Sequence, residues 1–297
     1  MRDWLIQCRL VFFWIRPQMN FLFAARQVAR STFARTTIAR TSLVLGLCAP
    51  ALFTMSAAKA DTLNIKYSVH FSVLPIGNAF LSGSVSPAAY SVEASVKLSG
   101  LASMVSSSKG VATAAGAFAG GKLVPQSYAT TAANSKQTRT IRMAISGGNV
   151  SGLEINPPFD EAPDRVPITD ASKRGIFDPL GGILMPYTGE FGEGVCNRTL
   201  PVFDGGARFN IALSYSGTKQ VKAKGYSGPV MVCSARYTPV AGHRPDKPAT
   251  KFMADNRDLE VWMAPVGQTH VAAPYKISVK TMTGTAVIEA TEFSDTP

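Results

Sequence analysis

The sequence contains few of the residues that metal binding and catalysis require. Its 297 residues include three histidines and four cysteines. The histidines His70, His243 and His270 fall at no metal-ligand spacing, and no two cysteines form a CxxC pair. A nucleophile elbow (GxSxG), a P-loop, an HExxH motif and a GxGxxG loop are all absent. We therefore expect neither a metal nor a cofactor, and an enzymatic activity is the less favoured prediction.

Charge is also scarce and unevenly placed. Only 16% of the residues are charged, with 19 acidic against 30 basic side chains and a formal net charge of +11. Eight basic residues and a single acid precede Asp61, so this first segment carries +7 of the net charge. The basic residues after Asp61 are scattered and lack the interleaved aromatics of a single-strand binder. We expect no nucleic-acid partner.

Residues 1–60 have the pattern of an export signal. An uncharged apolar run at 41–55 follows a series of arginines and ends in an Ala-x-Ala site at Ala60. The run is shorter than the roughly 20 residues that span a bilayer as a helix, so no permanent transmembrane anchor is expected. We predict cleavage after Ala60 and a periplasmic location.

Other interpretations of this segment remain open. The signal could be retained, or Cys48 could be acylated, although the preceding Leu47 is bulky for a lipoprotein signal. A mitochondrial transit peptide is a further alternative, because residues 26–42 are rich in Arg, Ser and Thr and poor in acids. Use of Met19 as the start would remove residues 1–18 from the protein.

Two cysteines, Cys196 and Cys233, remain after the predicted signal. In an oxidising compartment, two cysteines predict one disulfide. The alternative is a pair of free thiols or half of a metal site, for which the sequence offers no neighbouring ligand pattern.

Apolar and polar residues alternate along much of the remaining chain, which is typical of strands with one buried face. Asp204-Gly205 before one such run predicts a hairpin. We predict about ten strands in a single β-rich domain, residues 61–297, that is mainly β: one antiparallel, strongly bent sheet or an incomplete β-barrel. The segments with this alternation are 64–73, 90–98, 141–145, 209–215, 230–237, 259–263, 275–281 and 286–293.

Helical periodicity is rare, which argues against a fold of alternating strands and helices with a nucleotide cleft. One or two short helices are expected. Residues 101–107 could form two turns, and Asp178-Pro179 supplies an N-cap followed by proline at the first helical position, leading into 180–185. The proline-rich stretch 156–167 predicts an exposed connection.

Two groups of residues are candidates for binding or catalysis. Ser106 and Lys109 fit an S-x-x-K pattern, but the companion motifs of that enzyme class are missing, so a chance match is favoured. The loop after Cys233 is the better candidate for polar recognition, although solvated charges around a turn are the favoured explanation. Its candidate residues are Arg236, Tyr237, His243 and Arg244.

Several fragments in order along the chain resemble the bacterial envelope family called domain of unknown function 3108. The resemblance extends over about 63–293 and implies a secreted, β-rich protein with no assigned activity, so it supplies no catalytic residues. The fragments are Tyr67 with Gly77, then 123–128, 178–180, 202–205, 233–244 and 259–265.

A bent sheet can hold a ligand on its concave face. The favoured function is therefore a non-enzymatic binding module for a lipid or another apolar or amphipathic envelope ligand. The alternative is a structural or assembly protein that contacts an envelope protein partner through a sheet edge or through residues 156–167. The residues predicted to line a ligand are Tyr67, Val69, Phe71, Phe209, Ile211 and Leu213.

Overall fold

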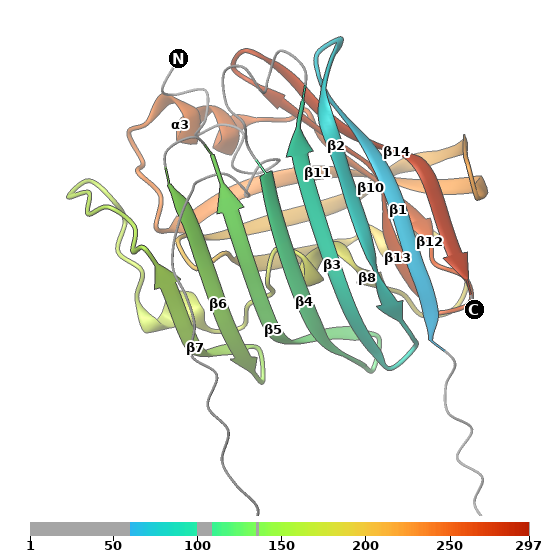
Figure 1. Cartoon of the computed structure of the whole chain (residues 1–297), viewed down its shortest axis with the longest axis horizontal. Coiled ribbons are helices and arrows are strands. Elements are labelled where there is room, and N and C mark those ends of the chain that lie inside the picture. The colour runs from blue at the N-terminus through green and yellow to red at the C-terminus, as the bar shows by residue number, and fades with distance from the viewer. Residues whose placement is uncertain (1–59, 100–108, 135–136, 297) are drawn as a thin grey trace, which may run out of the picture. The chain divides into compact units, whose positions relative to one another are not determined.

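The computed structural model describes residues 60–99, 109–134 and 137–296, all of which belong to one compact unit. Within these ranges it contains fourteen strands, one α-helix and three single-turn 3-10 helices (Figure 1). The strands are β1 (Asp61–Phe71), β2 (Leu74–Val85), β3 (Ala89–Leu98), β4 (Lys109–Ala119), β5 (Lys122–Ala133), β6 (Thr138–Ser146), β7 (Asn149–Asn156), β8 (Met185–Pro186), β9 (Arg198–Phe203), β10 (Arg208–Ala223), β11 (Tyr226–Ala241), β12 (Leu259–Pro265), β13 (Val271–Thr281) and β14 (Gly284–Thr296). The helices are η2 (Asp170–Lys173), η3 (Gly181–Ile183), η4 (Glu193–Val195) and α3 (Pro248–Asp255).

All the strands belong to one antiparallel sheet that does not close. The strand order is β7-β6-β5-β4-β3-β2-β1-β14-β13-β12-β11-β10-β9, with β8 paired to β13 outside this path. Two meanders, β1–β7 and β9–β14, therefore join where the first strand pairs with the last, with Ile65 opposite Phe293. The predicted fold class is confirmed: a single, bent, antiparallel sheet.

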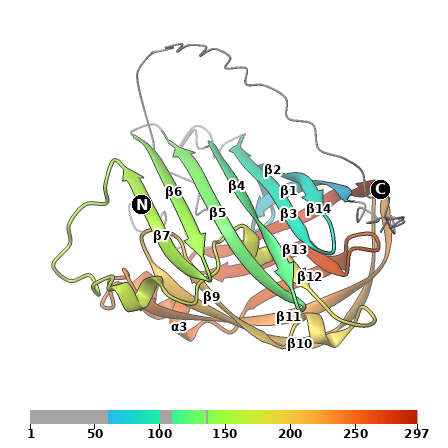
Figure 2. The same ribbon diagram turned by 90° about the horizontal axis from the view of Figure 1, so that it is seen from below.

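The sheet bends so that its two halves face one another, as Figure 2 shows. The strands of one half run steeply across those of the other (Figure 1). The main core lies on the concave side, where Leu63, Ile65 and Phe293 from the joining strands are at most 1% exposed. The connection between β7 and β9 also enters this core, because Ile176 and Leu184 pack in the same cluster. The chain therefore fills much of its own concave face.

A second core cluster surrounds the disulfide. The sulfur atoms of Cys196 and Cys233 are 2.06 Å apart and both residues are fully buried, so the pairing predicted from the sequence is present. Leu213 from β10 and Met263 from β12 pack around them, with Met253 of α3. The disulfide thus anchors η4 to the centre of β11.

The sequence patterns located the strands better than the helices. Seven of the eight alternating segments lie within a strand, the segment 64–73 extends two residues past the end of β1, and Asp204-Gly205 lies in the β9–β10 turn. The expected helix over 180–185 is wrong: only the turn η3 forms there, because the next residues leave it to pair with β13 as β8. The expected helix at 101–107 lies outside the described residues. Helix α3 was missed, although proline stands at its first position.

Candidate functional site

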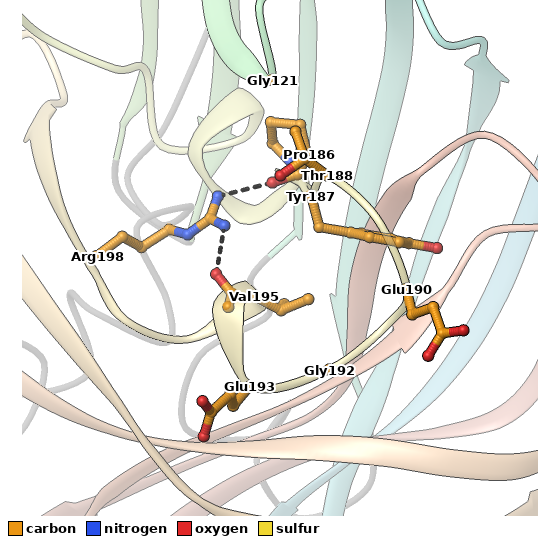
Figure 3. A pocket seen from close by; sticks show the side chains of 10 residues that line it. Gly121, Pro186, Tyr187, Thr188, Glu190, Gly192, Glu193, Val195 and Arg198 are labelled. Carbon is orange, nitrogen blue, oxygen red and sulfur yellow. Dashed lines mark hydrogen bonds between the residues drawn. The ribbon is translucent and has the colours of Figure 1, made fainter.

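A surface pocket of about 300 Å³ lies beside the disulfide, between β8 and η4 (Figure 3). Two elements that line it, β8 and η4, are each attached to the sheet. Pro186 of β8 pairs with Val271 of β13, and η4 leads directly into the disulfide at Cys196. The pocket is therefore built on rigid elements. The residues that line it are Gly121, Pro186, Tyr187, Thr188, Glu190, Gly192, Glu193, Gly194, Val195 and Arg198.

The half-buried guanidinium of Arg198 is the group in this pocket that could bind a charged ligand. Its two terminal nitrogens donate to the carbonyl oxygens of Pro186, at 3.0 Å, and Gly194, at 2.9 Å. Its Nε is buried without a partner, and burial lowers the pKa of the group. Arg198 takes part in none of the ion pairs found among the described residues. The guanidinium is held in place by neutral groups and keeps an uncompensated positive charge.

Two carboxylates line the same pocket but do not neutralise this charge. The side chains of Glu190 and Glu193 are exposed, and Figure 3 shows both directed away from Arg198. The ring of Tyr187 lies between the guanidinium and Glu190, and it contacts Phe191 with a centroid distance of 5.5 Å. An anionic group could therefore approach Arg198 beside an aromatic wall.

A second polar cluster lies inside the concave face. Asp178, which is 0% exposed, accepts hydrogen bonds at Oδ1 from the backbone of Leu180, at 3.0 Å, and of Gly181, at 2.6 Å. Its Oδ2 and the hydroxyls of Tyr90 and Tyr128 are buried without a hydrogen-bond partner. In this cluster η3 contacts β4 and β5, and Tyr90 and Tyr128 belong to the same part of the main core.

Gly181 brings the members of this cluster close together. A Cβ at Gly181 would lie 2.5 Å from Asp178 Oδ2 and 2.6 Å from the Tyr90 hydroxyl, so no other residue fits there without a shift. Burial raises the pKa of Asp178 to about 6, against the opposing effect of its two backbone hydrogen bonds. Burial, and then the charge of Asp178, raises the pKa of Tyr90 and of Tyr128. Burial therefore makes the charged form of this carboxyl less favourable than that of an exposed aspartate.

Asp178 makes the stability of the protein depend on pH. An aspartate pKa of about 3.9 in the unfolded chain rises to about 6 on folding, so the folded state binds the proton more tightly. The contribution of Asp178 to stability is therefore greatest below about pH 4 and falls by about 3 kcal/mol as the pH rises from about 4 through 6. Asp178→Asn keeps the acceptor oxygen without the charge. We expect this variant to match the wild type near pH 4 and to exceed its free energy of unfolding above pH 6.

Urea unfolding from pH 4 to pH 8 measures this difference, and subtraction of the two curves removes the titration of all other groups. A difference between Asp178→Asn and wild type that stays constant with pH would contradict the buried-carboxyl assignment.

The residues predicted to line a ligand are not brought together on one wall. Tyr67 lies in the main core, where its hydroxyl donates to the Pro274 carbonyl oxygen at 2.7 Å. Val69 and Phe71 belong to a small separate cluster near the end of β1. Ile211 and Leu213 pack around the disulfide, and Phe209 stacks on Tyr237 with the ring centres 5.3 Å apart. Their role in ligand binding stays a prediction.

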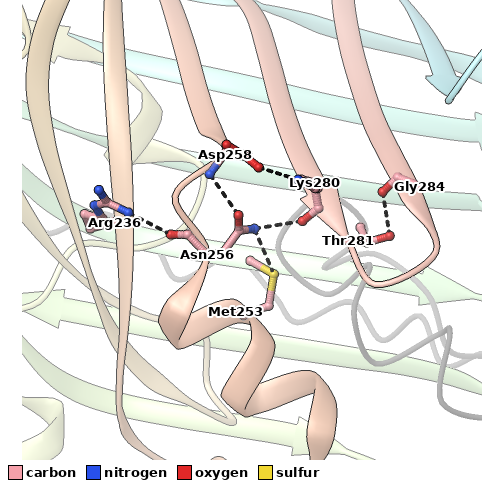
Figure 4. Close-up of polar contacts among 7 residues, drawn as sticks. All are labelled: Arg236, Met253, Asn256, Asp258, Lys280, Thr281 and Gly284. Carbon is pink, nitrogen blue, oxygen red and sulfur yellow. Dashed lines mark hydrogen bonds and ion pairs between the residues drawn. The ribbon is translucent and has the colours of Figure 1, made fainter.

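The residues predicted for polar recognition are engaged with the protein itself. Arg236 donates to the Asn256 carbonyl oxygen at 3.1 Å, within the network around α3 that Figure 4 shows. Arg244 donates to Asp164 Oδ2 at 2.7 Å, and the His243 carbonyl oxygen accepts from Val166 at 2.9 Å. The structure thus joins this loop to the proline-rich connection, which the sequence treated as a separate feature.

That connection, residues 157–167, also contacts the opposite edge of the sheet. Arg139 of β6 donates to the carbonyl oxygens of Pro157, at 2.8 Å, and Pro158, at 3.0 Å. Its guanidinium lies 4.3 Å from the centre of the Phe159 ring. The connection therefore contacts β6, near one edge of the open sheet, and also the residues that follow β11, near the other edge.

Sequence reasoning missed Arg198, Tyr90 and Tyr128 as members of polar sites. Arg198 follows the cysteine by two residues, which is the one local signal that could have drawn attention to it. The tyrosines occupy ordinary buried positions of alternating strands, and only the fold places them beside Asp178.

Comparison with known proteins places the chain in a family but assigns no activity. No curated protein matches the sequence. Among solved structures, the β-barrel-like protein of domain of unknown function DUF1849 from Brucella abortus aligns with a TM-score of 0.43 and 6% identity, covering 79% of this chain and 98% of that one. In the described residues, no helix is long and apolar enough to cross a membrane, and no group of His, Cys, Asp and Glu could hold a metal ion. The family model described as "Protein of unknown function (DUF3108)" matches residues 66–291, and the chain therefore belongs to the DUF3108 family.

Proposed function

We propose that the protein is an exported, non-enzymatic binding protein of the cell envelope that holds the anionic group of an amphipathic ligand at Arg198. The disulfide and the signal-like pattern of residues 1–60 support the export part of this proposal. The ligand part rests on the pocket beside the disulfide.

The observation that carries the ligand proposal is the uncompensated charge of Arg198. A half-buried guanidinium with no carboxylate partner is costly unless an anion completes it, and phosphate and carboxylate groups match its planar set of donors. The two carbonyl oxygens of Pro186 and Gly194 occupy one donor on each terminal nitrogen, which leaves other donors for a ligand.

The pocket also limits the size and polarity of the ligand. At about 300 Å³ it is at the small end of ligand sites, enough for a head group and a few carbon atoms. Pro186, Tyr187 and Val195 supply apolar wall. The concave face of the sheet is a poorer place for an apolar chain, because Ile176 and Leu184 of the connecting segment pack there.

Titration with dodecyl phosphate below its micelle concentration tests the proposal. We expect the wild type to bind it and Arg198→Gln to bind at least about tenfold more weakly, since a charge-assisted pair is lost. Isothermal titration calorimetry measures both affinities. Dodecyl maltoside, which has the same chain without the charge, should bind weakly to both proteins.

Arg174→Gln is the matched control, because Arg174 is an exposed arginine outside the pocket. Equal affinity of the Arg198→Gln and Arg174→Gln variants for dodecyl phosphate would refute the assignment.

A role in assembly through a sheet edge is the second candidate. Strand β7 is an edge strand of eight residues, of which all are exposed or half-buried, including Leu153 at 37% exposure. Such an edge can accept a strand from a partner protein. Edge pairing has no requirement for Arg198, so the titration above separates the two candidates.

A further inference from the structure

Two tight hairpin tips at one end of the sheet expose apolar side chains. The β1–β2 turn is Ser72-Val73, and the β13–β14 turn is Met282-Thr283. The tips lie side by side, because the Ser72 amide donates to the Thr285 carbonyl oxygen at 2.6 Å. Val73 is 88% exposed, Leu74 54% and Met282 51%.

The fold does not require apolar residues at these positions. Turn tips favour Gly, Asn and Asp, and Ser72 adopts a positive φ of 53° that a glycine or asparagine would adopt more easily. Val73 gains nothing from packing at 88% exposure. Clustered exposed apolar side chains of this kind mark a contact surface.

Two lysines behind the tips indicate that the partner of this contact surface is negatively charged. Lys97 of β3 and Lys109 of β4 stand directly opposite one another, and both are exposed. Like charges in this register destabilise a sheet. Neither lysine takes part in the ion pairs found among the described residues.

The other charges at this end do not cancel the two lysines. Lys280 beside the Met282 tip is paired with Asp258 at 2.7 Å, so that pair is locally neutral (Figure 4). His70 of β1 is half-buried. The net charge behind the apolar tips is therefore positive.

We propose that this end of the sheet docks on a membrane surface that contains anionic lipids, with Val73, Leu74 and Met282 entering the interface and Lys97 and Lys109 meeting the phosphate groups. Lys97 pairs with Asn78, four residues along β2 from Leu74, which places it about 13 Å behind the tip. A lysine stem can extend toward the head groups over part of that distance. Apolar tips followed by unpaired lysines match the order of layers in an anionic bilayer.

Vesicle co-sedimentation tests this docking on protein purified from the periplasm of an expression host. Vesicles of equal parts phosphatidylglycerol and phosphatidylcholine are compared with vesicles of phosphatidylcholine alone. We expect binding to the anionic vesicles that weakens at high salt, and a fall of about tenfold or more both in Lys97→Gln/Lys109→Gln and in Val73→Ser/Leu74→Ser/Met282→Ser.

Matched controls carry the same number of changes elsewhere on the surface. Lys122→Gln/Lys222→Gln removes two exposed lysines, and Phe80→Ser/Leu153→Ser/Val240→Ser removes three exposed apolar groups. Both should bind as the wild type does, and any contribution from residues 1–60 is common to all variants. Absence of binding, equal binding to both kinds of vesicle, or an equal loss in test and control variants would overturn the proposal.

The outcome is independent of the ligand pocket. Lys97→Gln/Lys109→Gln should bind dodecyl phosphate as the wild type does, since neither lysine lines the pocket. Loss of dodecyl phosphate binding with retained vesicle binding would leave the docking surface standing, and the reverse would leave the pocket standing.

Discussion

Replacement of Cys196 and Cys233 together by alanine is expected to lower the free energy of unfolding by about 4 kcal/mol. The bond joins residues separated by 37 positions, and opening a loop of that length returns this much chain entropy to the unfolded state. Both cysteines are fully buried in the second core cluster, so the loss of packing adds to the effect. Urea unfolding, followed by tryptophan fluorescence, measures the change.

Reduction of the wild type provides the control for this experiment. Reductant should lower the stability of the wild type toward that of the double variant and leave the variant unchanged. If reductant does not change the stability of the wild type and the double variant is equally stable, the two cysteines are not bonded in solution. Because η4 precedes Cys196 directly, the double variant should also weaken dodecyl phosphate binding at the neighbouring pocket.

Phe203→Ala is expected to cost about 3–5 kcal/mol, the usual range for truncating a buried phenylalanine. Phe203 ends β9, is 0% exposed, and packs in the main core. Its amide donates to the Phe177 carbonyl oxygen at 2.9 Å. This hydrogen bond fixes the end of β9 to residues 176–184, the part of the β7–β9 connection that packs on the concave face. Truncation leaves a cavity between the edge strand β9 and residues 176–184.

Phe80→Ala is the matched control, because Phe80 is 45% exposed on the outer face of β2. It should change the free energy of unfolding by no more than about 0.5 kcal/mol. Similar losses in the two variants would show that the packing of Phe203 against residues 176–184 stabilises the protein no more than the exposed Phe80 does.

The sequence predicted strands where large apolar residues alternate strictly and missed several in which this alternation is weak. The alternation of Ile65, Tyr67 and Val69 indicated β1 directly. Strand β4 has the sequence KGVATAAGAFA, in which alanine and glycine blur the difference between its two faces. Such strands form because neighbours on both sides supply hydrogen bonds, which a local pattern cannot show.

Helices and sites depended even more on distant partners. The Asp178-Pro179 pair predicts a helix start, and the aspartate does accept backbone hydrogen bonds as an N-cap would. The turn ends early because Met185 and Pro186 pair with β13, more than eighty residues away in the sequence. The pocket around Arg198 depends on that same pairing and on the disulfide, so the local position of Arg198 two residues after Cys196 could point to the residue but not to the pocket.

Composition and local pattern were sufficient to identify an antiparallel β protein and a pair of cysteines for one disulfide. These properties depend on residue type and on period-two alternation, which are local. Folding added the pairing of β1 with β14, the filling of the concave face by residues 176–184, and the uncompensated charge of Arg198. Each of these brings together residues far apart in the chain, and burial and charge compensation exist only after that contact is made.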